Sequence, residues 1–282
     1  MKQKGMTLIE LLVAMAITGL LGAGVYRTFT GQQHTYEVQD QIVDMQQNVR
    51  MAISRMTREL RMGGYGKLGA TFFDGGGMHG AYQHVVTPGG DGKSVTVVAA
   101  LQTLGTLTAN APNGSTTLTV SNGAAFDLDK KKYISINGME SYRIKKIDGN
   151  QVTLKASDKL IYSHFTGEPV FLVMSITYSI GMLDGISVLL RDDHLDHPNP
   201  QDNGPQPVAE NIENLQFRYV MKDGAVLDAV PPAQLDDIRM IRVTIVATSD
   251  KNKPDPVLAK VGDGFRRRTL TTNIQLRNLL FL

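Results

Sequence analysis

The chain of 282 residues contains no cysteine. This absence excludes disulfides, cysteine nucleophiles, and zinc or iron–sulfur sites built on thiolates. It does not argue against an exported protein. Roughly 220 residues lie outside the N-terminal apolar segment and its helical extension, which is enough to bury a core without disulfide support.

The chain also lacks an excess of positive or negative charge. The chain has 29 Lys and Arg against 27 Asp and Glu, a formal net charge of +2, so there is no electrostatic case for a nucleic-acid partner. Two basic runs, residues 130–132 and 266–268, lie beside expected strands, where such charges protect sheet edges; DNA binding during uptake is the alternative interpretation of these runs.

Catalytic patterns are missing as well. The sequence has no glycine-rich phosphate loop, no nucleophile elbow, no Ser/His/Asp set and no paired carboxylates of the kind used in acid–base catalysis. We therefore expect a protein that is not an enzyme and that needs no cofactor, apart from the calcium interpretation considered below.

The most informative segment that is present opens the chain. Residues 1–5 carry Lys2 and Lys4, and an apolar run of residues 6–25 follows with one acid inside it, Glu10. The run is long enough to span a bilayer, and the two lysines place the N-terminus on the cytoplasmic side. A carboxylate inside the membrane costs about 2.5–3.5 kcal/mol on insertion scales, so Glu10 needs a compensating partner.

Three interpretations compete for this segment. A secretory signal peptide has an apolar region of about 7–15 residues and a small-residue cleavage site, whereas this run is longer and no such site follows it. A plain membrane anchor explains the length but not Glu10. A cut after Gly5 would make Met6 the new N-terminus, one helical turn from Glu10. The amine of one copy could then pair with Glu10 of a neighbour and fix the register of assembly.

The string Gly5-Met6-Thr7-Leu8-Ile9-Glu10 resembles the processing site of type IV pilins and type II secretion pseudopilins. The resemblance implies that prepilin peptidase, a membrane enzyme, cuts between Gly5 and Met6 and methylates the new amine. In this family the glutamate is the fifth residue of the mature chain, as Glu10 would be here. The residue after the cut is usually Phe, and this chain has Met6 instead. Gly5 and Met6 are thus the expected processing residues and Glu10 the expected assembly residue.

A second pattern extends the helix beyond the membrane segment. Apolar residues recur at steps of three and four, which is typical of one face of an amphipathic helix: Val38, Ile42, Met45, Val49, Ala52, Met56 and Leu60. Gly63-Gly64 predicts its end. We expect one helix over residues 6–62, about 80 Å long, with residues 6–27 forming the transmembrane segment or filament core.

Three glycines, Gly19, Gly22 and Gly24, lie within the apolar run. Glycine lets neighbouring helices approach closely and also weakens a helix locally. The segment is therefore either a site of helix packing in the membrane or a stretch that loosens when the subunit leaves the bilayer, and the sequence leaves both interpretations open.

The remainder of the chain predicts strands. Residues 63–101 form a glycine-rich loop and a first strand. Residues 102–173 contain short β-rich runs separated by turn signals such as Asn137-Gly138 and Asp148-Gly149, which predicts a small all-β subdomain inserted in the head. Residues 174–282 contain longer strands, the first two of them joined by a turn at Asp184-Gly185. We expect these strands to form one antiparallel sheet packed on the C-terminal half of the helix: 175–179, 186–191, 212–221, 238–248 and 267–276.

The expected fold class is therefore α+β and pilin-like, with a long N-terminal membrane-spanning helix packed on an antiparallel β-sheet head. Four further segments are similar to PilW-type minor pilins and, in looser form, to J-type pseudopilins: 51–65, 208–219, 238–243 and 267–278. The resemblance covers both ends of the chain well and the inserted β region only weakly.

This resemblance implies a minor pilin of a type IV pilus system that helps to initiate or cap the fibre. The implied partners are prepilin peptidase, other minor pilins, the major pilin, the inner-membrane assembly platform and, before assembly, the lipid bilayer. The head would lie in the periplasm before assembly and on the cell-surface pilus afterwards. A J-type pseudopilin of type II secretion, and an adhesin or DNA-uptake module carried by a pilus, are the alternatives.

One run could bind a metal ion. Asp192, Asp193 and Asp196 stand at short spacing beside His194 and His197, and such oxygens can bind calcium while His with Asp could hold a transition metal. The spacing matches no EF-hand, and the prolines that follow favour a solvated loop between two strands. Calcium at the three aspartates is thus one interpretation and the solvated loop the other. The remaining histidines are isolated, and we expect no functional role for them: His34, His79, His84 and His164.

Overall fold

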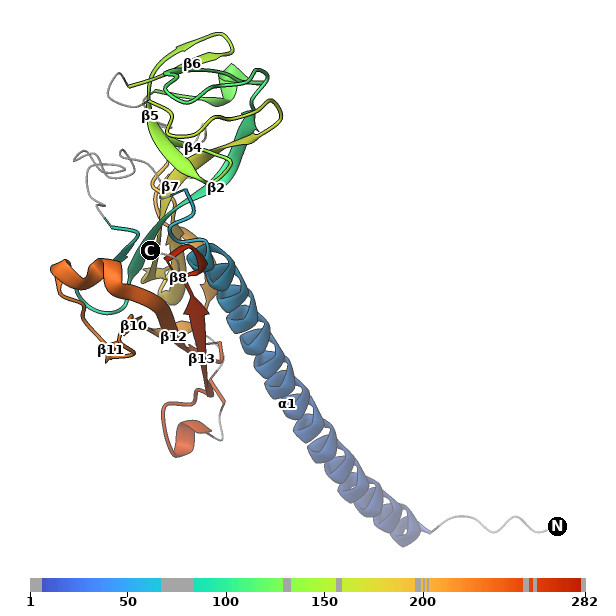
Figure 1. Ribbon diagram of the computed structural model, residues 1–282. Coiled ribbons are helices and arrows are strands. Elements are labelled where there is room, and N and C mark those ends of the chain that lie inside the picture. Colours follow the sequence, from blue (N-terminus) through green and yellow to red (C-terminus); the bar gives the residue numbers. More distant parts are fainter. Residues whose placement is uncertain are drawn as a thin grey trace.

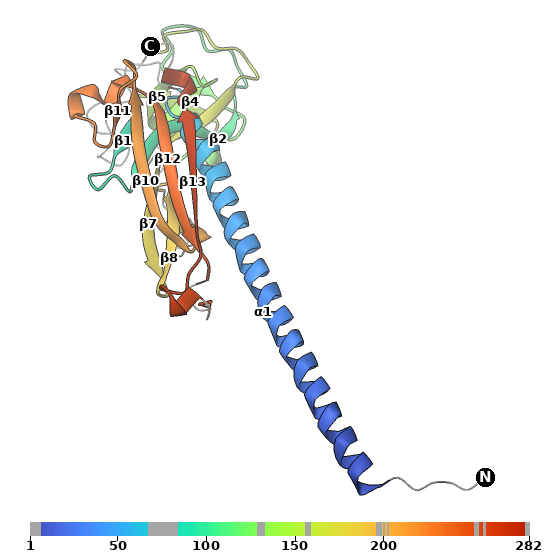
Figure 2. The ribbon, with the colours of Figure 1, turned by 90° about the horizontal axis from the view of Figure 1, so that it is seen from below.

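The computed structural model describes residues 7–66, 84–128, 133–155, 159–195, 199, 201, 203–250, 254–255 and 258–279. In this part of the chain one long helix, α1 (Leu8–Arg61), carries a β-rich head at its C-terminal end (Figures 1 and 2). The N-terminal half of α1 extends away from the head with no strand beside it. The expected α+β, pilin-like architecture is confirmed.

Helix α1 begins and ends at residues suited to those positions. Thr7 is the N-cap: its Oγ1 accepts a hydrogen bond from the N–H of Glu10 at 3.3 Å, and the Glu10 carboxylate accepts one from the N–H of Thr7 at 2.9 Å. This capping box satisfies two N–H groups that the helix leaves unpaired. At the other end Gly64 adopts φ +82° and its N–H donates to the carbonyl of Val98 at 2.9 Å, so the helix ends close to where Gly63-Gly64 predicts.

The predicted apolar face of α1 is the face that packs on the head. Val38 and Ile42, near the point where α1 leaves the head, are half-buried. Helix α1 packs against strands β9 (Gln206–Glu210), β12 (Ile238–Thr248) and β13 (Arg267–Gln275). The other five periodic residues are buried: Met45, Val49, Ala52, Met56 and Leu60.

Within the described residues the head contains two antiparallel sheets. The larger has nine strands in the order β1-β2-β7-β4-β5-β6-β3, with β8 paired to β7 and β9 paired to β8. Its strands are β1 (Val86–Pro88), β2 (Val95–Thr106), β3 (Thr117–Thr119), β4 (Tyr133–Ile136), β5 (Glu140–Asp148), β6 (Gln151–Leu154), β7 (Pro169–Leu183), β8 (Ile186–Asp192) and β9 (Gln206–Glu210).

The smaller sheet has four strands in the order β11-β10-β12-β13. Alternate residues of its central strand β12 are buried, as period-two patterning requires. The inward-facing residues of this sheet, together with the apolar face of α1, belong to the continuous hydrophobic core of the head. The strands are β10 (Ile212–Met221), β11 (Val226–Leu227), β12 (Ile238–Thr248) and β13 (Arg267–Gln275).

Two sequence-based expectations about the head need correction. The predicted single sheet over residues 174–282 is divided, because β7, β8 and β9 join the larger sheet. The predicted boundaries at 102 and 173 also fall inside strands: β2 and β7 pair from Val95↔Tyr178 to Thr106↔Pro169, with register shifts after Ala100 and after Thr103. The small all-β unit formed by β3 to β6 is therefore carried on the far ends of β2 and β7 (Figure 1). Alternation of apolar residues identifies strands but not their pairing partners.

The structure confirms hairpins at two of the predicted turns. Asp184 and Gly185 connect β7 to β8 with φ of 49° and 80° and place Leu183 opposite Ile186. Positive φ at both central residues is the requirement of a type I′ turn, whose twist matches that of the strands. Asn137 and Gly138 likewise have positive φ in the connection between β4 and β5.

A charged network fastens the C-terminal end of α1 to the larger sheet. Glu59 of α1 accepts hydrogen bonds from the hydroxyl of Tyr178 at 2.7 Å and from Nε of Arg191 at 3.0 Å. Arg191 also donates to Asp193 at 3.1 Å. Burial and the nearby Glu59 carboxylate raise the pKa of Tyr178, so its hydroxyl remains a donor. Only 13% of the Glu59 and Arg191 side chains is exposed, and charges this far from water must stay paired.

Removing Glu59 should therefore weaken the whole head. We expect Glu59→Ala to lower the free energy of unfolding by about 3–5 kcal/mol, because it leaves the Arg191 cation buried without its main partner. The measurement is denaturant unfolding of the full chain in detergent micelles. Arg55→Ala is the matched control, because Arg55 also faces Glu59 but 43% of its side chain is exposed; its effect should stay within about 1 kcal/mol. Equal effects of the two variants would contradict the assignment.

Candidate functional site

The N-terminal half of α1 is apolar, and none of the other described residues covers it. An 18-residue stretch of this helix is long and apolar enough to cross a membrane, and none of it is buried among the described residues. Such a surface is unfavourable in water, so it requires lipid or other helices. The exposed large apolar residues are Leu8, Ile9, Leu11, Leu12, Val13, Met15, Ile17, Leu20, Leu21, Val25, Tyr26 and Phe29.

Threonine hydroxyls within this half donate hydrogen bonds to the helix's own backbone carbonyls. The hydroxyl of Thr18 donates to the carbonyl of Ala14 at 2.8 Å, and that of Thr28 donates to the carbonyl of Gly24 at 3.0 Å. A segment that lies in hydrocarbon or in an apolar bundle must pair its polar groups internally. These hydroxyls therefore meet the pairing requirement both of a lipid bilayer and of an apolar helical bundle.

The glycines do not interrupt the helix. Helix α1 is continuous through Gly19, Gly22 and Gly24, and an added Cβ at any of them would meet no other atom within 4 Å. Gly24 lies in a shallow apolar depression beside Leu21 and Val25. The open space at these glycines is available to a second helix, while the interpretation that the segment loosens stays a prediction.

Glu10 stands at the start of this apolar half and is engaged by Thr7. Its Oε2 accepts from the N–H of Thr7 at 2.9 Å and from the Thr7 hydroxyl at 3.0 Å. Sequence reasoning missed the role of Thr7, although Thr7 and Glu10 have the spacing of a capping box. Gly5 and Met6 lie outside the described residues, so their processing and the pairing of Glu10 with a neighbour's amine stay predictions.

The loop that follows β8 holds the aspartates of the calcium interpretation. Asp193 pairs with Arg191 and accepts from the N–H of Leu195 at 3.2 Å, while Asp192 accepts from the N–H of His194 at 2.8 Å. Among the described residues no group of three or more His, Asp or Glu side chains is arranged to hold a metal. Asp196 lies outside the described residues. Calcium at this loop stays a prediction, with Asp192 and Asp193 already bonded to protein groups.

A buried histidine in the β3–β6 unit was not foreseen. His164 and Glu140 are only 2% and 0% exposed, and His164 Nε2 lies 2.6 Å from Glu140 while Nδ1 lies 2.6 Å from Glu168. Burial opposes the charge, but hydrogen bonds to the two carboxylates outweigh it and raise the pKa of His164. Glu140 also accepts from the N–H of Ile161 at 3.1 Å. The cluster therefore ties the loop before β7 to strand β5.

The comparisons with known proteins bear on the N-terminus alone. Residues 1–26 match the prokaryotic N-terminal methylation motif. This match supports a pilin- or pseudopilin-type substrate of prepilin peptidase, and proteins with this motif are structural rather than enzymatic. No curated protein and no solved structure matches the chain.

The histidine cluster makes stability depend on pH. The folded-state pKa of His164 lies above its ordinary value of 6.5. The contribution of protonated His164 to the free energy of unfolding is therefore complete below about pH 6.5 and is lost as the pH rises through the folded-state pKa. His164→Gln should lower the free energy of unfolding by about 3 kcal/mol at pH 6 and flatten its pH dependence above pH 6.5. Thermal unfolding across pH measures both effects. His34→Gln, which changes a more exposed histidine, should keep the wild-type slope; a wild-type slope in His164→Gln would contradict the assignment.

Proposed function

We propose that this chain is a minor pilin of a type IV pilus system. It is processed by prepilin peptidase, incorporated through α1, and helps to initiate or cap pilus assembly. The observation that carries the proposal is the N-terminal half of α1, which carries the methylation motif and is apolar and exposed among the described residues. The same helix continues without a break into the half that packs on the head.

The apolar half of α1 has two successive environments in this mechanism. Before assembly the bilayer covers it, with Lys2 and Lys4 inside and the head in the periplasm. On assembly the helices of neighbouring subunits replace the lipid, and the same kind of heterologous contact repeats along the fibre. The exchange needs no hydrophobic gain, because lipid tails and apolar side chains are equally apolar. Specific packing and polar pairing therefore select the assembled state.

Glu10 supplies that polar pairing. After cleavage Met6 carries a free amine, and the carboxylate of Glu10 binds the amine of a neighbouring subunit. The contacts with Thr7 do not compete, because a carboxylate has about four acceptor positions. Instead they hold the carboxylate at the start of the helix, where an incoming N-terminus arrives. Each pair formed removes two charges from the apolar surroundings and fixes one register.

The shape of the head supports a subunit present in few copies. The β3–β6 unit projects from the end of the head away from the free end of α1 (Figure 1). A fibre built only of such heads would have to leave room for this projection at every repeat. Other minor pilins and the major pilin are the partners that share the helical bundle, and the inner-membrane platform delivers the subunit to it.

The N-terminal motif equally favours a second function, that of a J-type pseudopilin of type II secretion. The two proposals differ in which fibre, the pilus or the pseudopilus, should be missing when the gene is deleted. Deletion of the gene should abolish or strongly reduce surface pili, counted by electron microscopy, and leave secretion of exoproteins unchanged. Normal pili together with lost secretion would favour the pseudopilin.

The role of Glu10 is tested by separating its charge from its capping function. Glu10→Val and Glu10→Gln should insert and be cleaved normally but assemble poorly, since neither side chain can form an ion pair with the protonated amine; the measurement is the amount of subunit in sheared fibres. Thr7→Ala is the matched control. It removes the N-cap side chain and lowers the stability of the helix by about 1 kcal/mol, but it keeps the Glu10 carboxylate, so assembly should persist. Normal assembly of Glu10→Gln would remove the pairing argument.

A further inference from the structure

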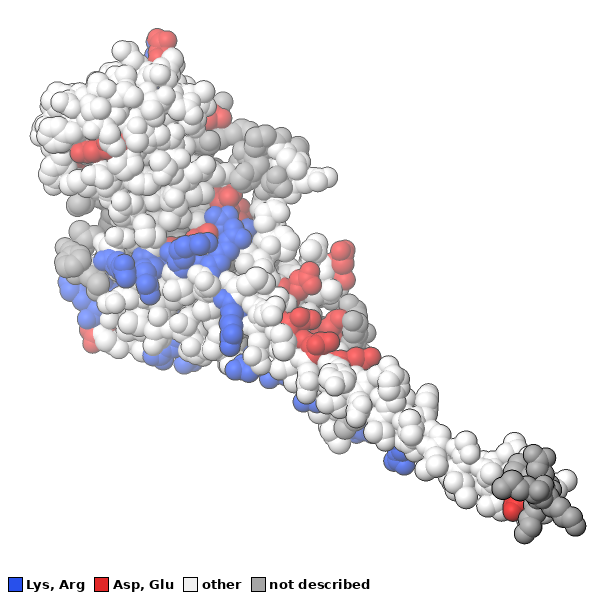
Figure 3. Space-filling model, turned by 90° about the vertical axis from the view of Figure 1, so that its right-hand side faces the viewer, with Lys and Arg blue, Asp and Glu red and all other residues white. Residues whose placement is uncertain are grey.

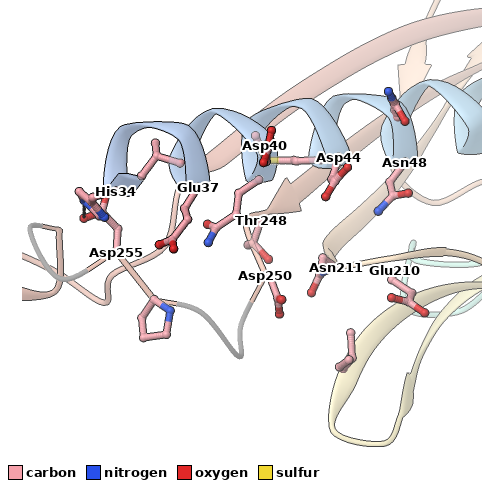
Figure 4. Close-up of a pocket in the computed structure, with 16 residues that line it drawn as sticks. His34, Glu37, Asp40, Asp44, Asn48, Glu210, Asn211, Thr248, Asp250 and Asp255 are labelled. Atoms are coloured by element: carbon pink, nitrogen blue, oxygen red, sulfur yellow. Dashed lines mark ion pairs between the residues drawn. The ribbon is translucent and has the colours of Figure 1, made fainter. Parts of the chain in front are cut away.

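An acidic cleft lies where α1 leaves the head. It has a volume of about 650 Å³ and is bounded by α1 on one side and by the ends of β9, β10 and β12 on the other (Figure 4). Six carboxylates line it: Glu37, Asp40 and Asp44 from α1, and Glu210, Asp250 and Asp255 from the head. Figure 3 shows acidic side chains gathered beside the middle of α1.

Most of this negative charge is not neutralised by nearby cations. Asp255 pairs with Arg266 at 2.9 Å and faces His34 at 3.6 Å. In contrast, no hydrogen bond or ion pair joins the side chains of Glu37, Asp40, Asp44 or Glu210 to any described residue. The three acids of α1 stand at steps of three and four, so they share one face of the helix and repel one another.

A second observation concerns neutral oxygens in the same cleft. Thr248 is 1% exposed and its Oγ1 has no hydrogen-bond partner among the described residues; the buried Oδ1 of Asn211 has none either. The two residues are neighbours, because the N–H of Thr248 donates to the carbonyl of Asn211 at 2.9 Å. Both line the wall that faces α1 (Figure 4). A buried oxygen left without a partner is costly, and a cation would satisfy both of them.

The donor set selects the kind of cation. Most of the polar side-chain atoms of the residues that line the cleft are carboxylate, amide or hydroxyl oxygens, the hard ligands of calcium, which takes six to eight oxygens with flexible geometry. Magnesium requires a stricter octahedron and keeps more of its water. Transition metals favour imidazole or thiolate, and the cleft has only His34, which faces Asp255.

We propose that this cleft binds calcium through Asn211 and Thr248 together with carboxylates that face them, Asp44 from α1 and Asp250 from the head. Water ligands fill the remaining coordination positions in a cleft of this size. Because its ligands come from both α1 and the head, the ion fastens the helix to the head at the lower end of their contact, at the opposite end from Glu59. This site is distinct from the loop that carries Asp192 and Asp193.

The test is calcium-dependent thermal unfolding of the full chain in detergent micelles, after treatment with EDTA. Calcium at about 0.1–10 mM covers the range of extracellular calcium modules and should raise the melting temperature by roughly 3–5 °C at ten times the dissociation constant. Magnesium, and sodium chloride at equal ionic strength, should give a much smaller shift. No calcium shift in the wild type, or an equal shift with sodium chloride, would overturn the proposal.

Variants locate the ion. The double variant Asp44→Asn with Asp250→Asn should fold, because it relieves repulsion between like charges, and should lose the calcium shift; Thr248→Val should weaken it. Asp223→Asn, on a distant exposed turn, is the matched control and should keep the full shift. Asp192→Asn should keep it as well. A shift that survives in the cleft variant, or that disappears in Asp192→Asn alone, would place the ion elsewhere and overturn the assignment.

Discussion

The structure depends on one constraint: a single 54-residue helix must satisfy two different environments along its length. Its C-terminal half buries Val49, Ala52 and Met56 in its own head, while its N-terminal half exposes apolar residues that no other part of the described structure covers. Apolar surface of that extent has to be removed from water. The N-terminal half of α1 therefore requires lipid or other apolar helices around it.

The junction between the two halves must be rigid for this arrangement to serve assembly. Because α1 is continuous from the exposed half into the head, any force on the head acts directly on the apolar segment. Glu59, Tyr178 and Arg191 hold the upper end of the contact through short hydrogen bonds in a poorly solvated place. An unbroken helix and a buried ion pair are a stiff combination, because neither can yield without leaving charge or backbone groups unpaired.

The sequence predicts local features well and long-range pairing poorly. The face of α1, its end at Gly63-Gly64 and the hairpin at Asp184-Gly185 follow from residue spacing and turn chemistry, which act over a few positions. The division of the head into two sheets does not, because β2 and β7 pair residues more than sixty positions apart. His164 was missed for the same reason: Glu168 is a near neighbour, but Glu140 is reached only through the fold. At the N-terminus, the motif and Glu10 follow from the residues alone, whereas the Thr7 cap depends on the capping-box spacing of Thr7 and Glu10 at the start of a helix.

The two ends of the helix–head contact are chemically opposite. At the upper end opposite charges attract across a buried pair, so the contact is closed without any added ion. At the lower end like charges face one another across the cleft between Asp44 and the strand ends, so repulsion favours opening unless cations enter. The contact between α1 and the head is therefore less favourable electrostatically around residues 34–48 than around Glu59. Because salt screens repulsion between exposed charges, the ionic strength of the solution acts on this end of the contact more than on the buried pair at Glu59.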